Sequence, residues 1–314
     1  FVSVVKNEKK KIYQDNSVLM VDSINPYLLA GNTVFIESRK KPICAVPQII
    51  KGSSPVDGGN LLLSESERDE LLSKNPDAEK FIRKFYGAKE YLHSIPRYCL
   101  WLEGILPEEL NKMPYIKERV REVKKFRSES TKEATRKYAD YPLRFMEMRQ
   151  PDSDYILIPR HSSENRRYIP MGFLSSDAIC GDANIMMPNA TLYHFGVLMS
   201  NVHMAWVRAV CGRIKSDYRY SNDIVYNNFP WCSPNEEQKQ RIERTAQSIL
   251  DARALYPDSS LSDLYDEVSM PPELRKAHTQ NDKAVMQAYG FSIKDTTEES
   301  CVAELMRMYQ KLIF

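Results

Sequence analysis

Short apolar runs separated by polar turns fill the first two thirds of the chain, a pattern typical of β-strands. The runs predicted as strands are Phe1–Val5, Ser17–Val21, Thr33–Glu37, Tyr98–Leu102, Tyr155–Ile158 and Tyr168–Leu174. The glycine- and proline-bearing segment Cys44–Leu63 is predicted to be loop.

Helical spacing interrupts these strands at three places. Ser64 with Glu67 forms a capping box that predicts two short helices, separated near Asn75, in the segment up to Tyr86. The longest helical stretch is 107–140, where one apolar face consists of Ile116, Val120, Val123 and Phe126. Residues 189–213 are predicted to form one capped amphipathic helix, with Leu192, Phe195, Leu198, Met199, Val202, Trp206, Ala209 and Val210 facing inward.

The chain becomes helical throughout after residue 233. Four helical segments are predicted, at 236–255, 261–268, 275–289 and 298–312. We therefore predict an α+β fold, in which a mixed or antiparallel sheet with helices is followed by an all-helical C-terminal domain.

The segment between the strands at 155–158 and 168–174 carries a dense set of planar donors and acceptors. Its residues are Arg160, His161, Ser162, Ser163, Glu164, Asn165, Arg166 and Arg167. Arginine can donate two hydrogen bonds to guanine, asparagine pairs with adenine, and glutamate accepts from cytosine N4. The segment therefore suits the reading of base edges in DNA, and the alternative is a solvated hairpin tip.

Several ordered motifs resemble the target-recognition part of MmeI-type restriction-modification enzymes. The motifs, in which a dash marks a position that does not carry the resemblance, are INPYL (24–28), VFIESR-KPI (34–43), GSSPVDGGNL (52–61), AEKFIR-FYGAKEYL (78–92), RYCLWL (97–102), IPR-SSENRRYIPMGFL (158–174), PNATLYHFGVLMSNVHMAWVRAVCGR (188–213) and KSDYRYS-DIVYNNFPW (215–231). The resemblance implies three parts: an end of, or connector from, a methyltransferase domain (1–43), a DNA target-recognition domain (44–232) and a helical C-terminal domain (233–314).

Such enzymes combine a nuclease, an S-adenosylmethionine-dependent adenine-N6 methyltransferase and a DNA-reading domain. The resemblance implies that this chain binds double-stranded DNA in the bacterial cytoplasm and works with a methyltransferase domain upstream of Phe1. S-adenosylmethionine, and Mg²⁺ where a nuclease is present, would bind in that longer protein. The Asn25-Pro26-Tyr27 triplet lacks the second proline of the methyltransferase motif, and we expect no catalytic, cofactor or metal site in this chain.

Charge is unevenly distributed along the sequence. Residues 115–149 contain 11 Lys and Arg against 6 Asp and Glu, whereas residues 236–314 contain 10 against 14. We expect phosphate contacts from Arg119, Arg121, Lys124 and Lys125, with Arg127 also largely outward; the alternative is a hydrated helix face. Lys215, Tyr218 and Arg219, where basic and aromatic residues alternate, are further candidate DNA-binding residues.

Two other functions stay open at this point. Glu109 and Glu122 resemble part of a metal-nuclease carboxylate set, although a helix is an unusual place for it, and a pure protein-interaction module is also possible.

His194 and His203 lie nine residues apart and are predicted to be core or boundary residues rather than metal ligands. The six cysteines form no CxxC pair and are predicted to be reduced thiols. No apolar run reaches the length of a membrane span.

The sharpest hypothesis concerns Glu164 and Arg166. Side chains two residues apart in an extended segment emerge on the same side, so both can reach one base pair. Arg166 would bind guanine O6 and N7 while Glu164 accepts from the paired cytosine N4. The structural alternative is a local salt bridge between the two side chains.

Overall fold

The predicted strands around residues 155 and 172 pair with each other in the computed structural model, which describes residues 9–14, 17–28 and 34–313. β7 (Tyr155–Pro159) lies between β9 (Gly172–Leu174) and β11 (Asn184–Pro188), and β3 (Ile50–Lys51) pairs with the other side of β11. All three pairings are antiparallel. β7 is buried on both faces, which makes this sheet the centre of the molecule.

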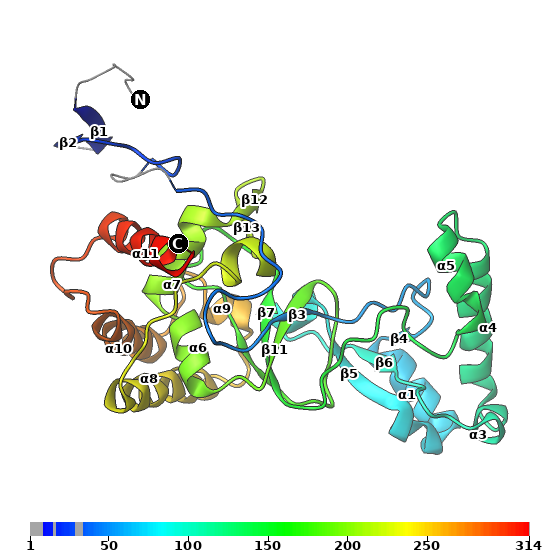
Figure 1. The fold of residues 1–314 in the computed structure, drawn as a ribbon. Helices are drawn as coiled ribbons and strands as arrows, with labels where there is room; N and C mark the ends of the chain where they lie inside the picture. Colours follow the sequence, from blue (N-terminus) through cyan, green and yellow to red (C-terminus); the bar gives the residue numbers. More distant parts are fainter. Residues whose placement is uncertain (1–8, 15–16, 29–33, 314) are drawn as a thin grey trace.

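A second sheet forms the smaller lobe of the elongated molecule, together with α1 (Glu65–Lys74), α3 (Pro107–Asn111) and α4 (Pro114–Ser128) (Figure 1). Its strand order is β10 (Ile179–Cys180), β5 (Ile82–Tyr86), β6 (Tyr98–Leu100) and β4 (Leu62–Leu63). The other elements of this part are η1 (Pro76–Phe81), α5 (Glu133–Lys137) and η2 (Tyr138–Asp140). Tyr91 and Leu92 of α2 (Ala88–Leu92) share a core with β7 and β11 of the central sheet instead. Apolar side chains from β4, β5, β6 and α4 share one core.

A close backbone approach joins the two sheets. The backbone N–H of Ser53, which follows β3, donates to the carbonyl oxygen of Cys180 in β10 at 2.7 Å. The backbone N–H of Asn184 in β11 donates to the carbonyl oxygen of Gly181 at 3.0 Å. A Cβ atom on Gly52 would lie 2.1 Å from the carbonyl oxygen of Gly181, so only glycine fits at this position.

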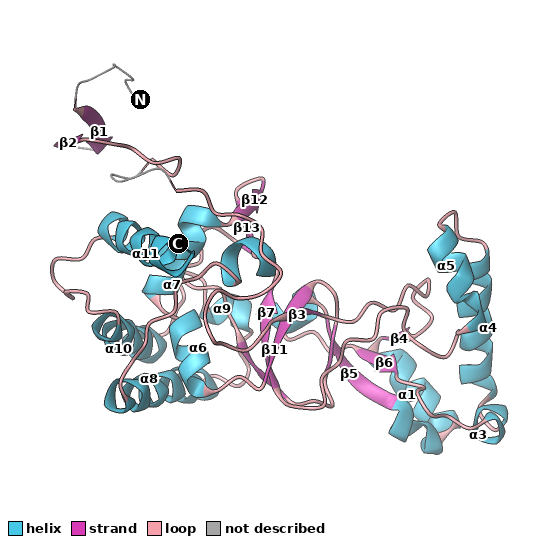
Figure 2. Ribbon diagram, in the orientation of Figure 1, coloured by secondary structure: helices cyan, strands magenta, loops and turns pink. Residues whose placement is uncertain are grey.

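The larger lobe is helical, as predicted (Figure 2). The C-terminal helices are α8 (Glu236–Ala254), α9 (Leu261–Leu264), α10 (Pro272–Ala288) and α11 (Glu298–Ile313). They share one large core with α6 (Leu192–Leu198), α7 (Asn201–Val210) and η3 (Asn222–Tyr226). The α+β class and the helical C-terminal region are therefore confirmed.

Two sequence predictions for the N-terminal half are wrong. Residues 82–86, predicted to be helical, form β5, because pairing with β6 and β10 outweighs local helix propensity. Residues 34–37 are not in a strand; the backbone N–H of Ile36 donates to the Tyr27 hydroxyl instead. The predicted strand at 17–21 is present as β2 (Ser17–Val21), which forms a hairpin with β1 (Lys10–Gln14), and the predicted strand at 1–5 lies outside the described residues.

The predicted helix at 189–213 is also wrong in its extent. It divides at Ser200, whose buried side chain accepts a hydrogen bond from the backbone N–H of His203 and caps α7. Arg213 lies in β12 (Gly212–Ile214), which forms a hairpin with β13 (Asp217–Arg219).

The stretch at 107–140 consists of α3, α4, α5 and η2 rather than one helix. On α4, Ile116, Val120 and Val123 are buried as predicted, but Phe126 is 44% exposed and Arg127 is 0% exposed. The inward face follows spacings of four, three and four residues, which lead to Arg127 and leave Phe126 one position off the face.

Candidate nucleic-acid interface

The candidate recognition loop, residues 160–167, is fixed at its start by a short strand. β8 (His161–Ser162) pairs antiparallel with β13, so that His161 lies opposite Arg219. The carbonyl oxygen of Arg160 accepts from the backbone N–H of Tyr220 at 2.8 Å, and the Arg160 side chain donates to the carbonyl oxygen of Asp182 at 3.4 Å. The loop therefore starts from a rigid sheet edge. A turn follows, in which the backbone N–H of Arg166 donates to the carbonyl oxygen of Ser163.

Half of the residues of this loop are exposed to solvent, as a base-reading segment requires. His161, Glu164, Asn165 and Arg167 are exposed, whereas Arg160, Ser163 and Arg166 are half-buried. Partial burial, with Arg160 and Arg219 nearby, lowers the pKa of His161, which keeps its imidazole neutral at pH 7.

Ser162 is the exception among the loop residues. Its side chain is buried, and its hydroxyl group has no hydrogen-bond partner within the described residues. We had predicted it to be a DNA-binding residue, and that prediction is wrong for this arrangement because the strand pairing of β8 turns its side chain inward.

Glu164 and Arg166 contact different neighbours and do not form the local salt bridge considered above. The Glu164 carboxylate lies 3.7 Å from the Arg213 guanidinium, and its backbone N–H donates to Asp217 Oδ1 at 3.3 Å. Arg166 Nη2 donates to the hydroxyl of Ser262 at 2.9 Å. Burial lowers the pKa of Arg166, and Asp217 and Asp266 oppose this shift by favouring the charged form.

Arg167 is linked to the C-terminal domain through a buried carboxylate. Its guanidinium lies 3.7 Å from Asp282 Oδ2, which also accepts from the Tyr168 hydroxyl at 2.6 Å. The other oxygen of Asp282 accepts from the backbone N–H of Asn201 at 2.8 Å. Burial raises the pKa of Asp282 to about 6, although these three donors favour its ionised form.

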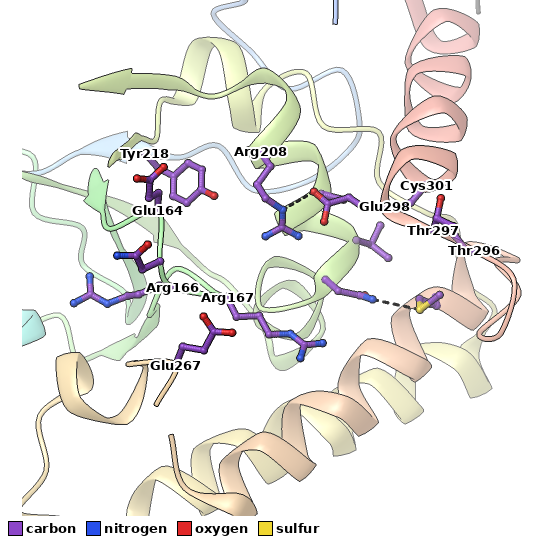
Figure 3. A pocket seen from close by; sticks show the side chains of 15 residues that line it. Glu164, Arg166, Arg167, Arg208, Tyr218, Glu267, Thr296, Thr297, Glu298 and Cys301 are labelled. Atoms are coloured by element: carbon purple, nitrogen blue, oxygen red, sulfur yellow. Dashed lines mark hydrogen bonds and ion pairs between the residues drawn. The ribbon is translucent and has the colours of Figure 1, made fainter. Parts of the chain in front are cut away.

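A cavity of about 550 Å³ lies where the loop meets the helices (Figure 3). Its charged lining includes Arg166, Arg167 and Arg208 together with Glu267 and Glu298. Arg208 Nε donates to Glu298 at 2.6 Å, which joins α7 to α11. Arg166 and Arg167 both line the cavity, and their side chains extend in different directions in Figure 3.

The hairpin of β12 and β13 stands beside the loop. Lys215, at its tip, and Arg219 are exposed, as DNA-binding side chains would be. Tyr218 is 3% exposed, and the Arg213 guanidinium lies over its ring at 4.5 Å from the centroid. Tyr218 was predicted as a DNA-binding residue, but in this arrangement its ring is buried and supports the hairpin.

The predicted phosphate-contacting residues of α4 divide into two groups. Arg121, Lys124 and Lys125 are exposed, and Arg121 pairs with Glu118 at 2.8 Å on the same helix. The Arg119 side chain is 14% exposed and donates to the carbonyl oxygens of Asn60 and Leu62, each at 2.7 Å. Arg119 thus anchors a loop of the smaller lobe. The prediction that its side chain contacts a phosphate is wrong in this arrangement, because backbone carbonyl oxygens occupy its donors. Arg127, also predicted to point outward, is buried.

The other candidate sites contain ordinary structural residues. His203 is buried and shares a hydrogen bond with the Tyr220 hydroxyl at 3.0 Å, and His194 Nδ1 bonds to the Thr191 hydroxyl at 2.9 Å. Burial lowers the pKa of His203 to about 3 and that of His194 to about 4. Glu109 accepts a hydrogen bond from Lys80, and all six cysteines are free thiols.

The described part of the chain contains neither a metal-binding cluster nor a membrane-spanning helix. No three His, Cys, Asp or Glu side chains lie together as metal ligands, and no helix has the length and apolar character needed to cross a bilayer.

The sequence analysis did not predict which residues of the chain contact the loop. Arg213, Arg208, Ser262 and Asp282 were not singled out, and three of them contact loop residues or Tyr168. Arg213 lies in a segment that had been predicted to be helical, which concealed its position opposite Glu164. Ser262 and Asp282 lie in a region with no recognisable chemical motif, so only their position in the fold reveals them.

The fold and the loop define the class of protein, an α+β recognition domain joined to a helical domain. Comparisons with known proteins identify the family. The family described as "MmeI, target recognition domain" matches residues 30–233, and "MmeI, C-terminal domain" matches residues 234–314. This chain belongs to the MmeI family.

Relatives are longer than this chain. DNA methyltransferase A of Bacillus subtilis (strain 168) is 37% identical over 303 residues, which cover 96% of this chain and 34% of that protein. A solved structure of the type IIL restriction-modification enzyme MmeI in complex with DNA has a TM-score of 0.90 and 41% identity, and the match covers 98% of this chain and 42% of that one. The chain thus spans about a third of the length of this curated relative.

Proposed function

We propose that this chain is the DNA target-recognition module of a bacterial restriction-modification protein. It would select a short duplex sequence and hold it so that an adenine can flip into a methyltransferase domain elsewhere in the same polypeptide, in the cytoplasm. S-adenosylmethionine would supply the methyl group there, and Mg²⁺ would serve a nuclease domain where one is present. The observation that carries the proposal is the similarity, over 98% of this chain, to a protein solved in complex with DNA.

The exposed loop would read bases. Arg166 would donate to guanine O6 and N7, and Glu164 would accept from the cytosine N4 of the same pair. The contact between Glu164 and Arg213, at 3.7 Å, is long enough for the exposed carboxylate to accept a further donor. Arg160, His161, Ser163, Asn165 and Arg167 would add contacts to neighbouring bases or to the backbone.

The exposed basic residues outside the loop would bind phosphates. Arg121, Lys124 and Lys125 lie on α4 in the smaller lobe, whereas Lys215 and Arg219 belong to the hairpin beside the loop (Figure 1). Contacts from both lobes would fix the position of the duplex without reading its sequence.

The proposal is tested by measuring binding of the 314-residue chain to fluorescent duplex DNA between 50 and 200 mM salt. We expect binding that weakens steeply with salt, because several phosphates are neutralised and counterions are released. Calorimetry should detect no tight binding of S-adenosylmethionine to this chain.

Two results would overturn the proposal. No binding to DNA even at low salt would favour a protein-interaction module. Cleavage of the DNA by this chain after addition of Mg²⁺ would favour a self-contained nuclease.

A further inference from the structure

The C-terminal domain holds the end of the recognition loop and the residues that follow it at three points. Ser262 accepts from Arg166 at 2.9 Å, Asp282 accepts from Tyr168 at 2.6 Å, and Arg253 Nη1 donates to the carbonyl oxygen of Met171 at 2.6 Å. These contacts fall at residues 166, 168 and 171. A segment of six residues is thus fixed against α8, α9 and α10.

α9, which carries Ser262, is itself firmly anchored. Ser260 caps it together with Asp263, and Leu264 is buried in the core. Tyr265, which follows α9, is 2% exposed, and its hydroxyl accepts from Arg253 Nε at 2.9 Å and contacts His278 Nε2 at 2.8 Å. The Ser262 hydroxyl is therefore held in one place relative to the loop.

The contact with Ser262 uses one N–H group of the Arg166 guanidinium and leaves its other N–H groups available for base contacts. Arg166 Nη2 donates to Ser262 Oγ, and a guanidinium has five N–H donors in a fixed planar arrangement. An arginine without such a contact samples many rotamers, and fixing it on binding costs affinity and selectivity. The hydrogen bond that Arg166 donates to Ser262, on an anchored helix, restricts the direction in which the guanidinium points.

We propose that Ser262 is a positioning residue that orients Arg166 for base reading, so that the C-terminal domain contributes to sequence specificity. The inference rests on the proposed function of Arg166. Ser262 does not contact the base; it acts through the orientation of the guanidinium, as supporting residues do in other binding sites.

The experiment compares Ser262→Ala with the unchanged chain. The preferred duplex is first selected from a random library, and affinity is then measured for that duplex and for one with the Arg166-dependent base pair replaced. We expect Ser262→Ala to reduce discrimination at this pair about fivefold to tenfold, a part of the selectivity that a bidentate arginine provides. Discrimination at other pairs, affinity for unrelated DNA and the melting temperature should not change.

Two further variants serve as controls. Ser262→Thr keeps the hydroxyl group and should retain discrimination. Ser259→Ala removes a hydroxyl group just before α9 that forms no hydrogen bond within the described residues, and it should behave like the unchanged chain.

Arg166→Ala separates the two ways in which the inference can fail. If Arg166→Ala abolishes discrimination at the pair while Ser262→Ala preserves it, Ser262 does not position Arg166 and the inference is wrong. If Arg166→Ala itself preserves discrimination at every pair, the proposed base-reading role of Arg166 is wrong.

Discussion

Arg127 shows how one buried charge can hold together an irregular part of the fold. Its guanidinium donates to five backbone carbonyl oxygens in two segments of the chain, those of Pro55, Val56, Tyr138, Tyr141 and Arg144. Burial lowers the pKa of Arg127, yet five acceptors compensate for the loss of water. We expect Arg127→Ala to lower the free energy of unfolding by about 4 kcal/mol, because it leaves several buried carbonyls unpaired.

Urea denaturation measures this effect. Arg121→Ala, on the exposed side of the same helix, is the matched control and should change stability by less than about 0.5 kcal/mol. Equal effects of the two substitutions would contradict the structural role of Arg127.

Asp282 gives a pH-dependent prediction. Its folded pKa, about 6, lies above its ordinary value of 3.8, so the folded protein binds this proton more tightly than the unfolded chain. The resulting contribution to stability is fully present below about pH 4 and is lost as pH rises through about 6. Relative to Asp282→Asn, the unchanged chain should lose on the order of 2 kcal/mol of unfolding free energy between pH 4.5 and pH 7.

Denaturation of both proteins at the two pH values tests this expectation. An exposed aspartate substituted in the same domain, Asp258→Asn, should leave the pH profile of the unchanged chain intact. A stability difference between the unchanged chain and Asp282→Asn that stays constant with pH would show that Asp282 does not carry the effect.

Residue types predicted the chemistry of the site better than they predicted its geometry. Glu164, Asn165 and Arg167 are exposed, as base-reading residues must be. Arg119 and Tyr218 have the right chemistry for DNA, but backbone carbonyls and a neighbouring arginine engage them within the fold. A sequence shows that an arginine is present and does not show which acceptors surround it.

The exposed lysines of α4 test whether this helix contacts phosphates. Lys124→Ala should weaken binding to all duplex sequences about equally and reduce the slope of log affinity against log salt by about one unit, because one phosphate contact is lost. The control is Lys311→Ala, an exposed lysine on α11 in the other lobe, which should leave the slope unchanged. A change in the preferred sequence after Lys124→Ala would instead assign α4 to base reading.

Periodicity predicted the elements well where they pack on one face. The four C-terminal segments were placed within a few residues of α8 to α11, because long amphipathic helices have strong signals. The strand β5 was missed because its pairing with β6 and β10 is nonlocal. The division between α6 and α7 depends on Ser200, a buried cap that the surrounding apolar pattern conceals.

At the scale of the whole molecule, contacts between distant segments define the site. Arg166 and Ser262 are separated by 96 residues, and Tyr168 and Asp282 by 114. Spacing along the chain gives no signal for such pairs. The family resemblance indicated which loop to consider, but only the fold shows that the C-terminal helices support it.

We propose that the loop at 160–167 reads bases in duplex DNA. The most direct measurement is selection from a random duplex library by the unchanged chain and by the variant carrying both Glu164→Lys and Arg166→Asp, with circular dichroism to confirm folding. Exchanging the charges exchanges donor and acceptor at one base pair. We predict that both proteins select related motifs in which one G·C pair has opposite orientations. An identical motif for the two proteins, or no enriched motif with the unchanged chain, would contradict the account.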